Sequence, residues 1–372
     1  MDNKFKLLMP LDIQMFANPN DALFYEVLSA PVLATVVEQN PYLFDPYLGE
    51  AFFPRDKVDG LEISYIKDTR GLPMVLKPSS FDVATPIRDR ANVELSSTSM
   101  PYFKEGMILG EKERQDLFKA FNQSPEAYRS ILRRLYDDRN TLVLGADAQA
   151  ERLRMQALTK GKIDILANGE QLEYDYGVPA NQKHTVATAD EWNKPTADVL
   201  KTISLAKSTV RNATGRAIRY MLMNSATFDK LMVNDQFKSL VNPLAANAGN
   251  IPVMTDEELR RAIERYTGLR VLLYDKVFLD EEGVTQQFFP EGIVTFLPDG
   301  ELGRTNYGTT PQEFDLLNSS NHNAEVAIVN VGVAITSYKQ VDPVNSKTIV
   351  SQIVMPSFEQ ANNIFIANVY TP

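Results

Sequence analysis

The side chains most often used for acid–base and metal chemistry are sparse in this chain of 372 residues. It contains no cysteine and only two histidines, His184 and His322. Without cysteine the chain cannot form disulfides, thiolate nucleophiles or cysteine-ligated metal sites. Both histidines lie in polar segments, so we expect them to be exposed and without a catalytic role. These counts disfavour most classes of enzyme.

Two acidic clusters and one glycine-rich stretch remain as candidate ion or phosphate sites. Asp137 is followed by Asp138, and residues 280–282 read Asp-Glu-Glu. Adjacent carboxylates do not converge on one cation without further ligands, so we predict that both clusters are solvated. The glycines of residues 300–308 lack the spacing and the following helix of a phosphate loop, so we predict an ordinary loop there. The sequence therefore predicts no catalytic residue, no cofactor and no metal site.

Charge and hydropathy narrow the class of protein further. The chain has 38 basic and 48 acidic residues, a formal net charge of −10. An acidic chain is a poor candidate for a protein whose main task is to grip phosphate backbones. Pro10 and Asp12 interrupt the apolar start too early for a signal peptide. We expect a protein of cytosolic origin with no membrane segment.

The strongest single element is a long amphipathic helix at about 124–160. Ser124 and Pro125 form a helix start, and Gly161 supplies the stop. At 1.5 Å per residue such a helix is a rod of ~54 Å. Its charges mix both signs, so we interpret them as a solvated face, with a phosphate-facing stripe as the less favoured alternative. They are Arg129, Arg133, Asp137, Asp138, Arg134, Arg139, Asp147, Glu151, Arg152 and Arg154.

The segments around this helix differ in character. Residues 1–50 are broken by prolines and read as an arm with a short helix at 21–30, or alternatively as an ordinary helical subdomain. Residues 51–105 alternate as short strands with little apolar area, which need a partner surface. A hairpin follows the long helix at 163–176, residues 179–324 alternate helices with strands, and the tail returns to strands. We expect the tail to pair with that hairpin.

The order of these parts resembles the Hong Kong 97-type fold of tailed-bacteriophage major capsid proteins. Local sequence is similar to the lambda-like major capsid protein E family over nearly the whole chain, apart from residues 179–196 and 242–250. The similar segments are residues 9–17, 48–54, 86–88, 101–104, 161–163, 168–169, 175–177, 274–308, 342–343, 355–356 and 365–369.

The resemblance implies an α+β fold with named parts. These are an N-terminal arm (1–50), an extended loop (51–105), a peripheral domain (106–178 and 325–372) containing the long spine helix, and an inserted α/β axial domain (179–324). It implies a structural head protein of the virion, not an enzyme. Eight residues are expected at assembly interfaces: Phe52, Phe53, Arg55, Ile63, Tyr65, Arg88, Tyr102 and Lys104.

The resemblance also implies partners. The chain would assemble with itself into hexamers and pentamers of an icosahedral shell around double-stranded DNA, held non-specifically, in the host bacterial cytoplasm. A separate scaffolding protein and a portal protein are expected, and a decoration protein stays open. We expect no lysine–asparagine crosslinks. Two alternatives remain at this point: an encapsulin-like nanocompartment shell subunit, and an α/β enzyme or binding module.

Overall fold

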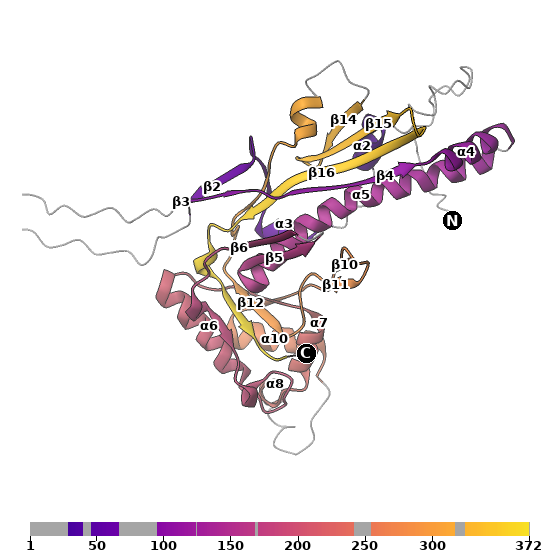
Figure 1. Cartoon of the computed structure of the whole chain (residues 1–372). Coiled ribbons are helices and arrows are strands. Elements are labelled where there is room, and N and C mark those ends of the chain that lie inside the picture. Colours follow the sequence, from indigo (N-terminus) through magenta and orange to yellow (C-terminus); the bar gives the residue numbers. More distant parts are fainter. Residues whose placement is uncertain are drawn as a thin grey trace, which may run out of the picture.

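The two largest sheets among the described residues, one of six strands and one of five, both contact one long helix (Figure 1). The computed structural model describes residues 29–39, 46–66, 95–123, 125–167, 170–241, 254–316 and 324–371. The helix expected at 21–30 falls almost entirely outside these residues. The structure instead describes a helix α2 over Ala30–Gln39, with Pro31 in its first turn.

The long helix α5 spans Pro125–Lys160, 36 residues, as the sequence predicts. Gly161 ends it in a left-handed conformation with φ +68°, and its N–H donates to Ala157 O at 3.0 Å. A preceding helix α4 at Glu111–Gln123 was not anticipated. In Figure 1, α4 lies beside the right-hand end of α5, where the two helices project together.

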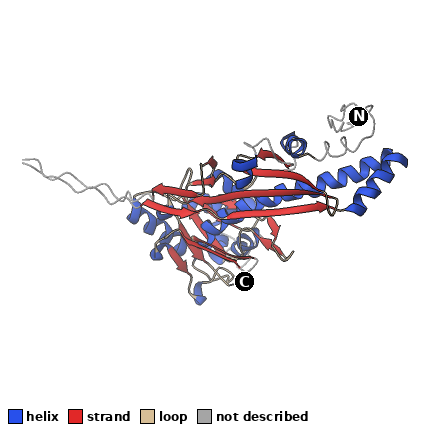
Figure 2. Cartoon of the chain, turned by 45° about the horizontal axis from the view of Figure 1, so that its top comes forward, coloured by secondary structure: helices blue, strands red, loops and turns tan. Residues whose placement is uncertain are grey.

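A six-stranded sheet packs along α5 (Figure 2). Its main path is β1 (Arg55–Lys57), β13 (Arg304–Tyr307), β16 (Asn345–Ser357), β15 (Val333–Gln340) and β14 (Ala324–Val329), with β4 (Tyr102–Leu109) paired to β16. Gln352 donates to Ala146 O at 2.7 Å and Arg139 donates to Thr348 Oγ1 at 2.8 Å, which fixes β16 on α5. Helix α2 contacts β14, β15 and α5.

The tail does not pair with the hairpin after α5, so that expectation is wrong. This hairpin, β5 (Lys162–Ala167) with β6 (Glu170–Asp175), is a separate two-stranded sheet. Strand β16 is 13 residues long and is paired on both edges, with β15 on one side and β4 and β13 on the other. Its backbone groups are therefore satisfied without the hairpin.

A five-stranded sheet forms the second core, in the order β7 (Lys183–Thr185), β17 (Phe365–Asn368), β12 (Ile293–Leu297), β8 (Tyr220–Met223) and β9 (Arg270–Leu273). Its helices are α6 (Val199–Thr214), α7 (Ser225–Met232), α8 (Asp235–Val241) and α10 (Asp256–Thr267). Trp192 is fully buried in this core. The capping box that Thr255 and Glu258 predict is present at the start of α10.

Strands cross between the two cores. Strand β17 near the end of the chain pairs with β12 and β7, whereas β13, from within residues 179–324, pairs with β1 and β16. The glycine-rich stretch 300–308 is thus partly a strand, which corrects the expected loop. A Cβ on Gly303 would lie 2.0 Å from Ser357 O, so glycine permits this close pairing.

The remaining elements are short. Strands β2 (Glu62–Ile66) and β3 (Leu95–Ser99) form a ribbon, and β10 (Val277–Leu279) pairs with β11 (Thr285–Gln287) as a hairpin. Helical turns lie at Leu48–Phe52 (α3), Ala180–Gln182, Thr188–Asp190, Gln312–Leu316 and Ala361–Asn363. No helix among the described residues is long and apolar enough to cross a bilayer.

Candidate functional site: a buried junction of charges

Four charged side chains of α5 are buried, which corrects their interpretation as part of a solvated face, whereas Arg133, Arg134, Asp137 and Asp138 are exposed as that interpretation predicts. The exposed fractions of Asp147, Glu151 and Arg154 are 2%, 0% and 1%, and Arg139 is also buried. Buried charges of this kind persist only when they are paired and hydrogen-bonded. We call the cluster of Glu50, Arg55, Asp147, Glu151 and Arg154 the charged junction.

Glu151 lies at the centre of the junction and accepts three hydrogen bonds. Its donors are Gly49 N at 2.9 Å, Tyr274 Oη at 2.8 Å and Arg154 Nη1 at 3.2 Å. Gly49 belongs to α3, and Tyr274 follows β9. A Cβ at position 49 would lie 2.5 Å from a Glu151 oxygen, so only glycine allows this approach. One carboxylate therefore joins the segment before the extended loop, the long helix and the five-stranded sheet.

Arg55 forms the second half of the junction, at the start of β1. Its Nε and Nη2 donate to the Glu50 carboxylate at 2.9 and 3.2 Å, and its Nη1 donates to Asp147 Oδ1 at 3.2 Å. Asn330, in the β14–β15 turn with φ +49°, donates to the other oxygen of Asp147 at 3.0 Å. This geometry ties the loop root and the β14–β15 turn to α5.

Burial and neighbouring charges shift the pKa values of Asp147 and Arg55 in opposite directions. Burial raises the pKa of Asp147, and the nearby Arg55 and Arg154 guanidinium groups offset part of this effect. For Arg55, burial would lower the pKa, but the carboxylates of Asp147 and Glu50 raise it above its ordinary value, so it stays charged. Burial, followed by the Glu151 charge, raises the pKa of Tyr274.

Arg154 extends the network to β13. Its Nε donates to Thr305 Oγ1 at 2.7 Å, and that hydroxyl donates to Phe53 O at 2.8 Å. Arg154 Nη2 and Tyr307 Oη are buried without a hydrogen-bond partner among the described residues. The junction thus contacts α3, β1, β9, β13, the β14–β15 turn and α5. Its arrangement holds elements together and presents no nucleophile beside a base.

The structure places seven of the eight expected interface residues, in three groups. Phe52, Phe53, Ile63 and Tyr65 are buried in the core that this chain forms by itself, and Arg55 lies in the junction. Tyr102 and Lys104 are exposed on β4, with the Lys104 ammonium 5.7 Å from the Tyr102 ring centre. Arg88 lies outside the described residues. An interface role for these residues stays a prediction.

Sequence reasoning missed most of the junction, although part of its signal was present. Asp147, Glu151 and Arg154 are spaced by four and three residues, so they share one face of the helix. That face also carries Ala150 and Leu153 as near neighbours, both buried. Glu50, Tyr274, Thr305 and Asn330 carried no such signal because the fold brings them from distant segments.

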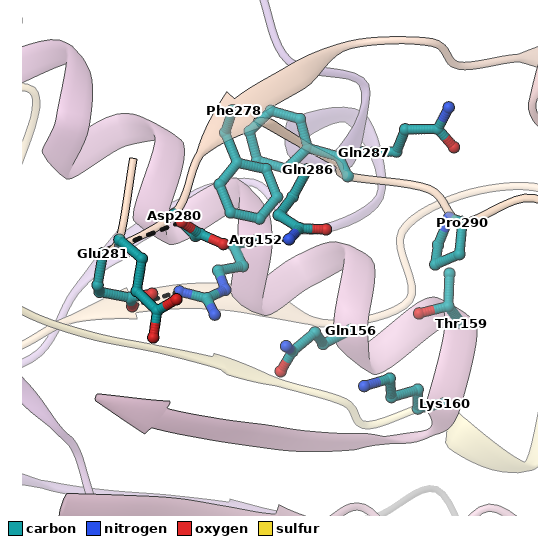
Figure 3. A pocket seen from close by; sticks show the side chains of 12 residues that line it. Arg152, Gln156, Thr159, Lys160, Phe278, Asp280, Glu281, Gln286, Gln287 and Pro290 are labelled. Atoms are coloured by element: carbon teal, nitrogen blue, oxygen red, sulfur yellow. Dashed lines mark hydrogen bonds and ion pairs between the residues drawn. The ribbon is translucent and has the colours of Figure 1, made fainter. Parts of the chain in front are cut away.

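A cavity of about 550 Å³ lies between α5 and the β10–β11 hairpin (Figure 3). Arg152 crosses it to bind Glu281, with Nη1 and Oε1 2.5 Å apart, and its guanidinium lies 5.3 Å from the Phe278 ring centre. Asp280 accepts from Gln286 and from the N–H groups of Glu282 and Val284, which lower its pKa.

Glu281 and Glu282 are exposed, as predicted, although Glu281 also pairs with Arg152 and Asp280 accepts the hydrogen bonds that close the turn. Of the two histidines, His184 is half-buried beside Phe365, with ring centres 6.2 Å apart, rather than exposed. Within the described ranges, no three His, Asp or Glu side chains are grouped to hold a metal ion.

Comparison with known proteins decides the family. Residues 29–369 match the family described as phage major capsid protein E. The chain belongs to that family. It is a structural capsid protein of the virion, and the family is not enzymatic. The search of curated proteins found no match to this sequence.

A solved structure supports the same fold, and a second one is reported beside it for comparison. The putative capsid protein of an Escherichia coli CFT073 prophage matches with a TM-score of 0.56 at 15% identity, covering 92% of this chain and 99% of that one. A phage-related protein from Bordetella bronchiseptica matches with a TM-score of 0.49 at 9% identity, covering 91% and 97%. The α+β Hong Kong 97-type fold expected from the sequence is confirmed.

Proposed function

We propose that this capsid protein forms the hexamers and pentamers of an icosahedral shell that encloses double-stranded DNA, and that the shell assembles in the host bacterial cytoplasm. Membership of the capsid protein E family supports this proposal. Copies of one chain close into rings through head-to-tail contacts, and many modest interfaces then stabilise the shell together.

The charged junction is the observation that carries the proposal at the level of residues. The ribbon β2–β3 is a two-stranded sheet of its own, and such a ribbon is marginal in isolation. The junction fixes α3 and β1 immediately before this ribbon through Gly49, Glu50 and Arg55. A rigid root lets a loop bear on a neighbouring subunit without displacing its own core.

We assign roles to the parts on this basis. The arm (residues 1–50) and the extended loop (residues 51–105) contact neighbouring subunits. The peripheral domain consists of residues 106–178 and 325–372, and the axial domain consists of residues 179–324. Tyr102 and Lys104, exposed on β4, are the accessible members of the expected interface set. Phe52, Phe53, Ile63 and Tyr65 support the loop root from within.

Further partners belong to the same proposal. A separate scaffolding protein directs curvature, a portal protein occupies one vertex, and DNA contacts the inner wall weakly. The net charge of −10 supports weak contact, because it leaves the chain no excess of cations for phosphate binding.

Electron microscopy and sedimentation of particles from cells that express the chain with its neighbouring phage genes test the proposal. We expect closed icosahedral shells that lose their regular size when the scaffolding gene is omitted. A chain that stays monomeric in the presence of all head genes would contradict the proposal.

A further inference from the structure

The α/β module exposes two apolar side chains of the β10–β11 hairpin on one flank and Leu205 of α6 on the opposite flank. In Figure 1, α6 lies on one side of this module and the β10–β11 hairpin on the other. Neither flank is covered by another element of the described chain at the residues considered below. A ring of identical subunits requires two different and complementary surfaces of this kind.

The hairpin patch is made of Val277 and Leu279, whose exposed fractions are 55% and 69%. In the strand register Val277 pairs with Gln287 and Leu279 with Thr285, so these side chains share the face opposite to Phe278. Phe278 itself points back to Arg152 and the cavity (Figure 3). The hairpin therefore has one face held by its own chain and one apolar face directed outward.

The hairpin is held rigidly enough to present that face. Arg152 binds Glu281, and Phe278 stacks with Phe288 with ring centres 4.7 Å apart. Asp280 is committed to the turn through its backbone and Gln286 contacts. Glu282 is the third acidic residue at the tip and is exposed. Among the described residues, its carboxylate makes no hydrogen bond or ion pair.

The opposite flank carries the complementary pattern on α6. Leu205 is 41% exposed and stands between the small exposed side chains of Ser204 and Ser208. Lys201, one turn earlier on the same face, is exposed and lies 3.9 Å from Asp190, a distance typical of a weak surface pair. The small side chains around Leu205 leave room for an apolar side chain of a second subunit. Lys201 can form an ion pair with an acidic side chain of that subunit.

We propose that the β10–β11 hairpin of one subunit packs against α6 of the next copy in the ring, with Leu279 beside Leu205 and Glu282 beside Lys201. The inference rests on the proposed ring assembly and adds which two surfaces meet. The apolar contact supplies association, and the charge pair sets register, because opposite charges at an interface mainly give specificity.

The absence of cysteine from the chain makes a clean crosslinking test possible. The full-length double variant L205C/L279C is assembled with the other head proteins and treated with a short bismaleimide. Because the two positions lie on opposite flanks of one subunit, a crosslink between them must join two copies. We expect a ladder on a denaturing gel that extends to pentamers and hexamers.

Controls define the contrary outcome. L205C alone, L279C alone and the pair L279C/V341C, with Val341 84% exposed on the distant β15–β16 turn, should give no ladder. Shells of L205C/L279C that form normally but do not crosslink would overturn the inference while leaving the proposed function intact. Failure of the unmodified chain to form shells would instead contradict the proposed function.

A charge exchange provides a second, independent measurement. We expect E282K and K201E each to reduce the yield of shells about tenfold, since a like-charge contact at an interface is costly. The combination E282K/K201E should restore the yield. The inference is wrong if both single variants assemble as the unmodified chain does, or if the combination does not restore the yield. This measurement also decides the question if L205C/L279C forms no shells.

Discussion

Removal of the Glu151 carboxylate should destabilise the subunit more than removal of any exposed acidic residue. In Glu151→Ala, Arg154 keeps its charge and its bond to Thr305 but loses the carboxylate with which it pairs at 3.2 Å. Gly49 N and Tyr274 Oη lose their acceptor as well. Breaking a buried ion pair from one side costs about 3–5 kcal/mol.

Urea unfolding of the unassembled subunit, followed by circular dichroism, measures this cost. With a slope near 3 kcal/mol per molar urea for a chain of this size, the midpoint should fall by about 1–2 M. Glu257→Ala is the matched control, because Glu257 pairs with Arg261 on an exposed face of α10. Exposed pairs of this kind contribute about 0–1 kcal/mol.

The double variant Glu151→Ala/Arg154→Met separates the ion pair from general loss of packing. Removing both charges leaves no uncompensated guanidinium, so the double variant should be more stable than Glu151→Ala alone. A cost below 1 kcal/mol for Glu151→Ala, or a double variant as unstable as the sum of its two single variants, would refute the reasoning.

Three further predictions concern single side chains. Gly49→Ala forces a methyl group against the Glu151 carboxylate and should cost about 1–3 kcal/mol by the same urea assay; an unchanged midpoint would contradict the close approach. Gly145→Ala is the matched counterpart in α5, where an added methyl group meets nothing within 4 Å, so the subunit should gain roughly 1 kcal/mol of stability; a loss would show that the site is constrained. The third is a pH effect at the start of α10. Hydrogen bonds from the N–H and hydroxyl of Thr255 lower the pKa of Glu258 in the folded state. Its contribution is therefore present above the unfolded pKa of about 4.3 and is lost as the pH falls through the lower folded value. Glu258→Gln removes the titrating carboxyl group, so it should reduce the difference between the melting temperatures at pH 7 and pH 3, and equal differences in both proteins would exclude this linkage.

Helix-end residues, capping residues and apolar spacing predicted the elements whose formation depends on residues close in sequence. Helix α5 was predictable because Pro125 and Gly161 mark its ends and its apolar residues recur at helical spacing. The capping box follows in the same way, because Thr255 and Glu258 lie three residues apart at the start of α10. Helix α4 was missed because its sequence is dominated by polar residues and its apolar positions are few.

The strand pairing could not be predicted from local signals. The glycine spacing of residues 300–308 excluded a phosphate loop and led us to predict an ordinary loop, whereas Gly303 permits β13 to approach β16 closely. The tail was assigned to one sheet, yet β17 pairs in the other. Pairing of distant strands depends on which edges remain open after the rest of the chain has folded, and the pattern of one strand does not contain that information.

By itself, the sequence determined that the chain is cysteine-free and acidic, contains one long helix, and has the order of elements of a capsid protein. Those properties follow from composition and from spacing of a few residues along the chain. Only the tertiary structure decided that Glu151, Arg154 and Asp147 are buried, because burial depends on Gly49, Arg55, Tyr274 and Thr305, which come from four other segments. A charge on a helix is solvated or buried according to what packs against it, and that is a property of the whole fold.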